Sequence, residues 1–563
     1  MHYQATQDNQ FETIQADSKF FSFTRHLLLT ALTALFCVPL LVVLGSLFFP
    51  ASEIWSHLYQ TVLGDYLFNS LILMVGVGML SLLLGVVPAW LVTMYRFPGS
   101  RYMEWALLLP MAMPAYIIAY TYTGLLDAAG PVQTGFRDWF GLQYGEYWFP
   151  EIRSIGGAVC MLSLVLYPYI YLLSRAAFIE QSICVLEVSR TLGCSAKSAF
   201  LRVALPLARP GIIVGLALVL METLADYGTV QYFGVPTFTT GIFKTWFGLG
   251  ESMAAAQLSA LLLLFMAVFL YLEKRSRRQA RYHHTSSRYS QLLQKPLTGL
   301  SAFIAMKVCV IPIFLGFLIP FAVLLTWTLG TYESVIDTAF YQLLFNSFIL
   351  ALITSFLAVA IAIFMTYSLR NNASFMQRLM VRFVSMGYAI PGTVIAVGVL
   401  MPFVWFDNTL DSILTSMFGI STGLLLSGTI FILVFAYLIR FLAISINTTD
   451  AAFGKIKPVM DEVAKTAGLS AFSMVKRIHI PMMKGSLLTA MLLVFVDVMK
   501  ELPATLILRP FNFNTLAVRT YELANEELLA HAAVPALAIV LTGIVPVIII
   551  SQSISHSRAS HDE

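Results

Sequence analysis

Twelve runs of about twenty mostly apolar residues constrain what this chain can fold into. A helix of that length crosses a hydrocarbon core of about 30 Å, and a bilayer accepts only structures that satisfy their own backbone hydrogen bonds. The chain is 58% hydrophobic and 11% charged, whereas soluble proteins are about a quarter charged. The sequence therefore predicts an all-α polytopic membrane protein, and its net charge of +4 gives no reason to expect a nucleic-acid partner.

The predicted spans form two groups of six. The first group is 27–49, 67–94, 103–125, 154–178, 211–231 and 252–272. The second group is 303–328, 345–369, 379–403, 421–447, 486–508 and 530–552. The expected organisation is an N-terminal tail (1–26), a first half (27–272), a basic polar linker (273–300), a second half (301–552) and a C-terminal tail (553–563).

The positions of Lys and Arg predict the orientation, because cytoplasmic loops of membrane proteins are enriched in both. With the N-terminus inside, only five of the 34 Lys and Arg fall outside: Arg137, Arg153, Lys244, Arg509 and Arg519. Lys307 and Lys500 fall within predicted spans, and all the others lie inside. Both termini are therefore expected in the cytoplasm.

The two halves repeat each other. The segment LFNS at 67–70 recurs at 344–347, and Pro114 recurs as Pro391, both at a spacing of 277 residues. Each half starts inside and crosses six times, so the two copies have the same orientation. The sequence thus predicts two parallel six-helix repeats, each with a proline that interrupts its third helix.

The cytoplasmic loops 179–210 and 448–485 carry the most specific part of the repeat. The first contains LEVSRTLGCSAKSAFLRVALP and the second DEVAKTAGLSAFSMVKRIHIP. The residues that match, all 275 apart, are Glu187, Thr191, Gly193, Ser195, Ser198, Arg202 and Pro206 with Glu462, Thr466, Gly468, Ser470, Ser473, Arg477 and Pro481.

This pattern predicts a helix, a turn and a second helix at the membrane surface. Gly193 and Gly468 supply the positive φ that ends a helix. Ser195 and Ser470 follow two residues later, where a hydroxyl caps the next helix. The prolines at the end of each motif are expected to break the chain into the next crossing. Such a hairpin can transmit a push from a partner to the membrane helices.

The motif E-x5-G-x9-[IV]-x-[LI]-P is similar to the EAA loop of the inner-membrane permeases of binding-protein-dependent ABC importers. Val188-Ser189 and Val463-Ala464 stand where Ala-Ala is usual. The resemblance implies the type I importer permease fold, a bacterial inner membrane, and a loop that docks in a groove of an ATPase subunit. The residues to which it assigns this coupling role are Glu187, Gly193, Ser195, Arg202, Pro206, Glu462, Gly468, Ser470, Arg477 and Pro481.

The later helices extend the resemblance to the cargo. The stretches 221–247 and 495–524 resemble the fused permeases of ferric-iron importers. The implied partners are a periplasmic binding protein that delivers Fe(III) and two copies of a separate ATPase, with no second permease chain. Permeases for thiamine, phosphonate and polyamine share much of this plan and stay open as alternatives. No cofactor is expected on this chain, because it has no G-x-x-x-x-G-K-[ST] phosphate loop and ATP would be used by the partner.

Two pairs of acids fall within predicted spans: Glu222 with Asp226, and Asp497 with Glu501, again 275 apart. Each pair is spaced i,i+4, which predicts that both carboxylates share one helical face. A charge within a membrane helix is costly, so it suggests a function. One hypothesis is that the acids line the translocation path or its outer gate, since carboxylates suit a hard trivalent cation. The alternative is internal pairing, with Lys500 as a local counter-ion. No metal-ligand set can be assigned.

Two other classes of protein compete with this interpretation. A twelve-helix ion-coupled carrier also has two parallel halves, but it does not need two coupling loops. An intramembrane enzyme is disfavoured, because the sequence has no H-E-x-x-H, no G-x-S-x-G and no metal-spaced His or Cys set.

Overall fold

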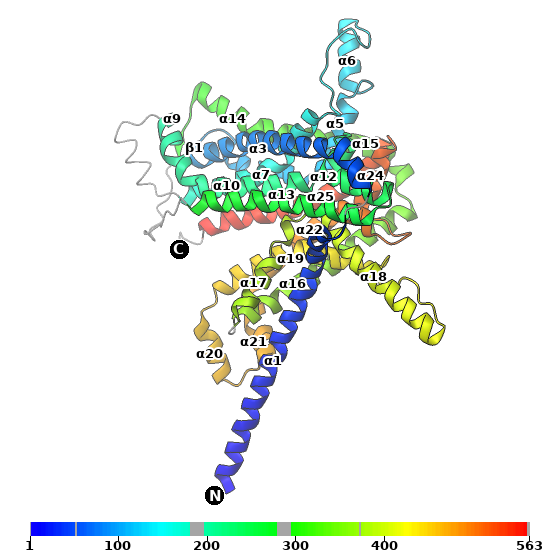
Figure 1. Cartoon of the computed structure of the whole chain (residues 1–563). Coiled ribbons are helices and arrows are strands. Elements are labelled where there is room, and N and C mark those ends of the chain that lie inside the picture. Colours follow the sequence, from blue (N-terminus) through cyan, green and yellow to red (C-terminus); the bar gives the residue numbers. More distant parts are fainter. Residues whose placement is uncertain (1, 51–52, 181–195, 279–293, 371–372, 560–563) are drawn as a thin grey trace. The chain divides into compact units, whose positions relative to one another are not determined.

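The computed structural model describes residues 2–50, 53–180, 196–278, 294–370 and 373–559 (Figure 1). Eleven helices in these ranges are long and apolar enough to cross a membrane. The segments Ser100–Ala112 and Ala115–Phe140, bent by 90° at their junction, raise the number to twelve if they count as one span. The only strands described are two residues long. The prediction of an all-α protein with about twelve membrane helices is confirmed.

The chain divides into two compact units, each built from segments that are distant in sequence. Unit 1 comprises Met1–Gly45, Ile349–Ile390 and Gly398–Val498. Its elements are α1 (His2–Gly45), most of α16 (Thr338–Arg370), α17 (Phe375–Val384), the 3-10 turn η6 (Gly387–Ala389), most of α18 (Gly392–Phe418), α19 (Ile430–Gly454), α20 (Pro458–Thr466), α21 (Ala471–Met474), the π-turn η7 (Val475–His479) and α22 (Ile480–Met499).

Unit 2 comprises Ser46–Phe348, Pro391–Val397 and Met499–Glu563. Its elements before the linker are η1 (Ser46–Phe48), α2 (Ile54–Thr61), α3 (Leu63–Met94), β1 (Tyr95–Arg96), α4 (Ser100–Ala106), η2 (Leu109–Ala112), α5 (Ala115–Leu126), α6 (Pro131–Phe140), α7 (Ile155–Glu180), α9 (Ala196–Ala199), η3 (Phe200–Ala204), α10 (Leu205–Ala225), α11 (Gly228–Tyr232), α12 (Phe238–Phe243), η4 (Lys244–Gly248) and α13 (Ser252–Arg278). Those after it are β2 (Lys295–Pro296), α14 (Gly299–Ile313), η5 (Phe314–Leu318), α15 (Ile319–Val335), α23 (Pro503–Leu508), α24 (Leu516–Asn525) and α25 (Leu529–Ala559).

The core of unit 2 is a set of closely packed apolar helices, in which α3 contacts α7 and α10 along much of its length. Small residues allow this approach: a Cβ added at Gly85 would lie 2.9 Å from the Ile170 side chain. In Figure 1, α6 projects away from these helices. The strands β1 and β2 pair in parallel and tie the end of the linker to the end of α3.

The first span of each half packs on helices of the other half. In unit 1, Phe36 of α1 stacks on Phe435 of α19, with ring centroids 5.6 Å apart. In unit 2, the π-turn η5 lies so close to α7 that a Cβ on Gly316 would be 2.8 Å from the Leu164 carbonyl oxygen. The predicted halves 27–272 and 301–552 are divisions of the sequence and stay predictions; packing follows a different division.

Three π-turns precede prolines by the same distance. η3, η5 and η7 each end two residues before a proline, at Pro206, Pro320 and Pro481. Proline has no N–H and its ring crowds the carbonyl four residues back. A wider π-turn relieves this clash and lets the helix continue. The predicted breaks at Pro206 and Pro481 are therefore wrong, since the helices run on as Phe200–Ala225 and Ala471–Met499.

Other predicted span ends also need correction. Spans 211–231 and 486–508 stop earlier, because α10 ends at Ala225 and α22 at Met499. The predicted span 379–403 is not one helix: Pro391 separates the turn η6 from α18. Its counterpart Pro114 separates η2 from α5 in the third span, where the helix axis turns by 90°. The prediction that both prolines interrupt their helices is confirmed.

Candidate functional site

The second coupling loop folds as a helical hairpin in unit 1. α20 ends in a left-handed turn at Gly468, whose φ is +79°. The Leu469 N–H donates to the Ala464 carbonyl at 3.0 Å, and the Gly468 N–H donates to Lys465 at 3.0 Å. These two bonds satisfy helix-end carbonyls in the manner of a Schellman motif. The turn predicted from the glycine is confirmed at this copy.

The next helix of the hairpin, α21, begins as the sequence predicts. The Ser470 side chain accepts a hydrogen bond from the Ser473 backbone N–H at 3.3 Å. A hydroxyl in this position satisfies one of the free N–H groups of a helix start. The α21 helix then runs through η7 into α22, so the hairpin is continuous with a membrane helix.

Three large apolar side chains of the hairpin are strongly exposed. Val459 and Val463 are each 61% exposed, and Phe472 is 76% exposed. The predicted coupling residues Glu462, Gly468, Ser470, Arg477 and Pro481 are all exposed too. Apolar side chains gathered on a polar loop are typical of a surface that binds another protein.

The opposite face of the hairpin is fastened to the rest of unit 1. Arg370, the last residue of α16, donates from Nε to Asp461 Oδ2 at 2.7 Å. Its Nη1 and Nη2 atoms donate to the carbonyls of Phe453 and Ile456, each at 2.8 Å. His479 Nε2 lies 2.8 Å from Asp461 Oδ1. We call Arg370, Asp461 and His479 the clasp.

The clasp is buried at its centre. The His479 ring is fully buried, and Asp461 is 7% exposed. Burial alone would raise the pKa of the Asp461 carboxyl, but hydrogen bonds from His479 and Arg370 outweigh it and hold that pKa below its usual value of 3.8. Asp461 is therefore ionised at neutral pH and neutralises the guanidinium that reaches it from α16.

The first coupling loop lies mostly outside the described residues. Glu187, Gly193 and Ser195 fall within 181–195, so their predicted roles stay predictions. Arg202 and Pro206 are described, in η3 and at the start of α10, and both are exposed.

The paired acids do not share helical faces as predicted. Asp226 is the residue after α10, with an extended backbone (φ −65°, ψ 134°), so it has left the helix that carries Glu222. Its carboxylate accepts from the Val230 N–H at 3.1 Å and from the Thr229 hydroxyl at 3.1 Å. Asp226 thus caps the short helix α11.

Glu501 has the same role in the second half. It follows the end of α22, and its carboxylate accepts from the backbone N–H groups of Ala504 and Thr505, each at 3.0 Å. The Thr505 hydroxyl donates to it at 2.7 Å. Glu501 is only 4% exposed. Negative charge at a helix start is stabilised by the free N–H groups there.

The two helix breaks lie together in unit 2. A Cβ added at Gly228, the first residue of α11, would be 2.8 Å from the Tyr116 Cβ and 2.9 Å from the Leu502 Cδ2. The repeated asparagines of the LFNS segments anchor the chain after each short helix. Asn69 donates to the Pro236 carbonyl at 2.9 Å, and Asn346 donates to the Asn514 carbonyl at 3.3 Å.

The structure gives the acids a role that sequence reasoning missed. The available signal was a Thr three residues after Asp226 and four residues after Glu501. At these distances a carboxylate that caps a helix start can also accept a hydrogen bond from the Thr hydroxyl. Glu222 and Asp497 are half-buried. No cluster of three or more His, Cys, Asp or Glu suited to a metal ion occurs in the described ranges. The hypothesis that the acids line a path stays a prediction.

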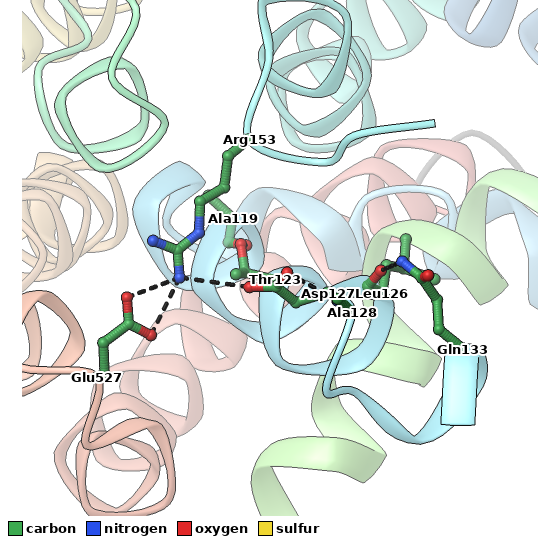
Figure 2. A network of polar contacts seen from close by, with 8 residues as sticks. All are labelled: Ala119, Thr123, Leu126, Asp127, Ala128, Gln133, Arg153 and Glu527. Atoms are coloured by element: carbon green, nitrogen blue, oxygen red, sulfur yellow. Dashed lines mark hydrogen bonds and ion pairs between the residues drawn. The ribbon is translucent and has the colours of Figure 1, made fainter. Parts of the chain in front are cut away.

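A polar network surrounds the end of α11 on the side predicted to face outward. Figure 2 shows Arg153 between Asp127 and Glu527, with Nη2 2.7 Å from Glu527 Oε1 and 3.6 Å from Asp127 Oδ2. Its guanidinium also lies 5.2 Å from the ring centre of Tyr232, the last residue of α11. The network joins residues of both sequence halves within unit 2.

Comparison with known proteins shows what the chain is similar to. Residues 81–278 match the family described as binding-protein-dependent transport system inner membrane component. The chain is 25% identical to an Fe(3+)-transport system permease protein of Haemophilus influenzae, over 88% of this chain and 91% of that protein. It is 29% identical to the molybdenum transport system permease protein ModB of Escherichia coli, over 31% of this chain and 76% of that protein.

A third relative covers both halves. A probable ABC transporter permease protein of Sinorhizobium fredii is 22% identical over 75% of each chain. The Haemophilus relative aligns with 88% of the chain, whereas ModB aligns with about a third of it, in keeping with a duplicated unit. These matches, the membrane helices and the folded coupling hairpin agree: residues 81–278 match a binding-protein-dependent transport system inner membrane component, and most of the chain is similar to permeases of ABC importers.

Proposed function

We propose that this chain is the complete transmembrane pore of an ATP-driven importer that moves Fe(III) into the cytoplasm by alternating access. The similarity to an Fe(3+)-transport permease over 88% of the chain carries this proposal. A periplasmic binding protein would deliver the cargo, and two copies of a separate ABC ATPase would drive the cycle. Because one chain supplies two coupling loops, no second permease chain is needed.

The exposed face of the second hairpin supports ATPase docking. Its apolar residues Val459, Val463 and Phe472 are each more than 60% exposed, so the described part of the chain leaves them largely uncovered. Glu462 and Arg477 add polar groups that can fix the register of a docked protein. The positive-inside distribution of Lys and Arg puts both coupling loops and both termini in the cytoplasm, where ATP is available.

The helix breaks support the proposed route for the cargo. In the middle of a membrane, a helix that ends and restarts is tolerated where it is buried in protein or lines a cavity. The breaks after α10 and α22 come from equivalent positions of the two halves and meet in unit 2, next to Tyr116. We place the outer gate of the pore at this meeting point, with Glu222 and Asp497 on the helices that lead to it.

The permease matches for molybdenum and sulfate define the competing cargo, an oxyanion. The test is uptake into vesicles that contain the chain, its ATPase and its binding protein, with radioactive iron, molybdate or sulfate in parallel. We expect ATP-dependent uptake of Fe(III) that excess thiamine, molybdate and sulfate do not reduce. ATP-dependent uptake of molybdate or sulfate alone would contradict iron as the cargo. Uptake driven by an ion gradient without ATP would contradict the whole assignment.

A further inference from the structure

We infer that the clasp is a positioning device that makes the second coupling hairpin move as one body with α16 and α19. The inference rests on the proposed function, because it concerns how ATPase movement reaches the membrane helices. Arg370 is bonded at once to the hairpin, through Asp461, and to the end of α19, through the carbonyls of Phe453 and Ile456. A displacement of α20 therefore pulls on both membrane helices.

His479 connects the same carboxylate to the helix that continues into the membrane. It occupies the last position of η7, one residue before α22. Its ring lies 5.2 Å from the Phe453 ring and 5.7 Å from the Tyr367 ring, measured between centroids. Below them, Met483 and Leu487 continue the buried cluster. Asp461 thus joins α20, α16 and α22, and a single carboxylate links three helices through its two oxygens.

The first half lacks these three residues. At the spacing of 275, Asp461 and His479 correspond to Leu186 and Ala204. At the spacing of 277 that relates the LFNS segments, Arg370 corresponds to Thr93, whose hydroxyl donates to Ala89 of its own helix. None of the three counterparts is ionisable, so the clasp belongs to one copy only.

The first half has the aromatic part of this arrangement without the clasp. Trp90 lies 5.3 Å from Phe178 and 5.0 Å from Phe200, between ring centroids. These residues correspond to Tyr367, Phe453 and Val475 of the second half. Apolar contacts hold side chains together but do not fix direction, whereas hydrogen bonds to a charged guanidinium do. The two coupling loops are therefore expected to transmit movement unequally, with the second loop as the stiffer lever.

The experiment replaces the three clasp residues of the second half with their counterparts from the first half. The variant Arg370→Thr/Asp461→Leu/His479→Ala removes the clasp without leaving a buried charge unpaired. Asp461→Asn is a milder second variant that keeps the side-chain shape. Asp450→Asn, at an exposed position of α19, is the matched control. Each is reconstituted with purified ATPase and binding protein, and ATPase binding, ATP hydrolysis and Fe(III) uptake are measured.

We expect the triple variant to bind the ATPase within about twofold of the unaltered chain and to keep hydrolysing ATP, while uptake per ATP falls about tenfold or more. Asp461→Asn should give a smaller fall in the same ratio, and Asp450→Asn none. Unchanged uptake per ATP in both clasp variants would overturn the inference. Equal loss of ATPase binding and uptake would also overturn it, because the clasp would then only maintain the shape of the hairpin. If the unaltered chain binds no ATPase, the proposed function fails instead.

Discussion

The helix breaks after α10 and α22 and the two coupling loops are both duplicated, yet the copies have diverged differently. At the breaks, the side chains of Asp226 and Glu501 differ in length but have the same role, since each carboxylate caps the short helix that follows. Where each coupling loop joins its membrane helices, both halves have clustered aromatic rings, but only the second half adds the charged clasp. The comparison indicates that the break is a shared requirement of both halves, while attachment of the coupling loop is specific to each.

The largest effect that would test this contrast is expected at Arg370. Arg370→Ala removes three hydrogen bonds and leaves Asp461 buried with only His479 as a partner, a loss of about 3 kcal/mol in local stability. Amide exchange in 455–479 should accelerate about 100-fold, as measured by mass spectrometry in detergent. Thr93→Ala, the matched change in the first half, should alter amide exchange in the first coupling loop by less than tenfold. Equal effects in the two copies would remove the contrast.

The next effect concerns the helix breaks. Glu501→Ala leaves two buried N–H groups without an acceptor and should lower stability by about 2–3 kcal/mol. Asp226→Ala removes one such bond at a less buried site, so about 1–2 kcal/mol is expected. The thermal unfolding midpoint of the purified protein measures both, with exposed Glu526→Ala as the control. If Asp226→Ala leaves the midpoint unchanged while uptake collapses, the carboxylate serves transport and not capping.

Acidification should loosen the second hairpin selectively. The pKa of Asp461 is lowered in the folded protein, so its stabilising contribution is present at neutral pH and is lost as pH falls below about 4 and through the folded pKa. Proteolysis within 455–479 by an acid-active protease should therefore increase over that range. Asp461→Asn should abolish the pH dependence. A transition that persists in this variant would assign it to another group.

The serines Ser470 and Ser195 at matching positions of the two coupling loops allow a direct comparison. Ser470→Ala removes the bond to the Ser473 N–H and should cost about 1 kcal/mol, seen as faster exchange at the start of α21. If the first loop forms the same turn, Ser195→Ala should produce the same change in its own segment. Absence of an effect at Ser195 would show that the two loops fold differently despite their shared motif.

The smallest effect is expected at the network around Arg153 in Figure 2. Glu527 is exposed, and surface ion pairs contribute less than about 1 kcal/mol. Glu527→Gln should change the unfolding midpoint by no more than a degree or two, and the difference should vanish in high salt. A larger change would mean that Arg153 and Glu527 hold the two sequence halves together more firmly than their exposure suggests.

Much of this protein could be predicted because the signals are local. Apolar runs located the membrane helices, and the repeat located Gly468 and Ser470, whose turn and cap depend only on neighbouring backbone atoms. The ends of helices were less predictable. In the sequence, Asp226 and Glu501 look like a continuation of the preceding helix. Their hydrogen bonds to N–H groups of the next short helix show that the preceding helix stops before them, and these groups come close only after the chain has turned. Pro206 and Pro481 misled in the other direction, because a π-turn absorbs each of them.

The sequence by itself determined the membrane class, the parallel repeat and the paired coupling motifs, since these follow from composition, charge and spacing along the chain. The tertiary structure decided which helices pack together and what the charged residues do. Arg370 precedes Asp461 by 91 residues and is bonded to it only because α16 and the hairpin meet. No periodicity encodes that contact. Its stabilisation comes from attraction and hydrogen bonding between two charges at a distance that the fold alone sets, which offset the cost of removing both charges from water.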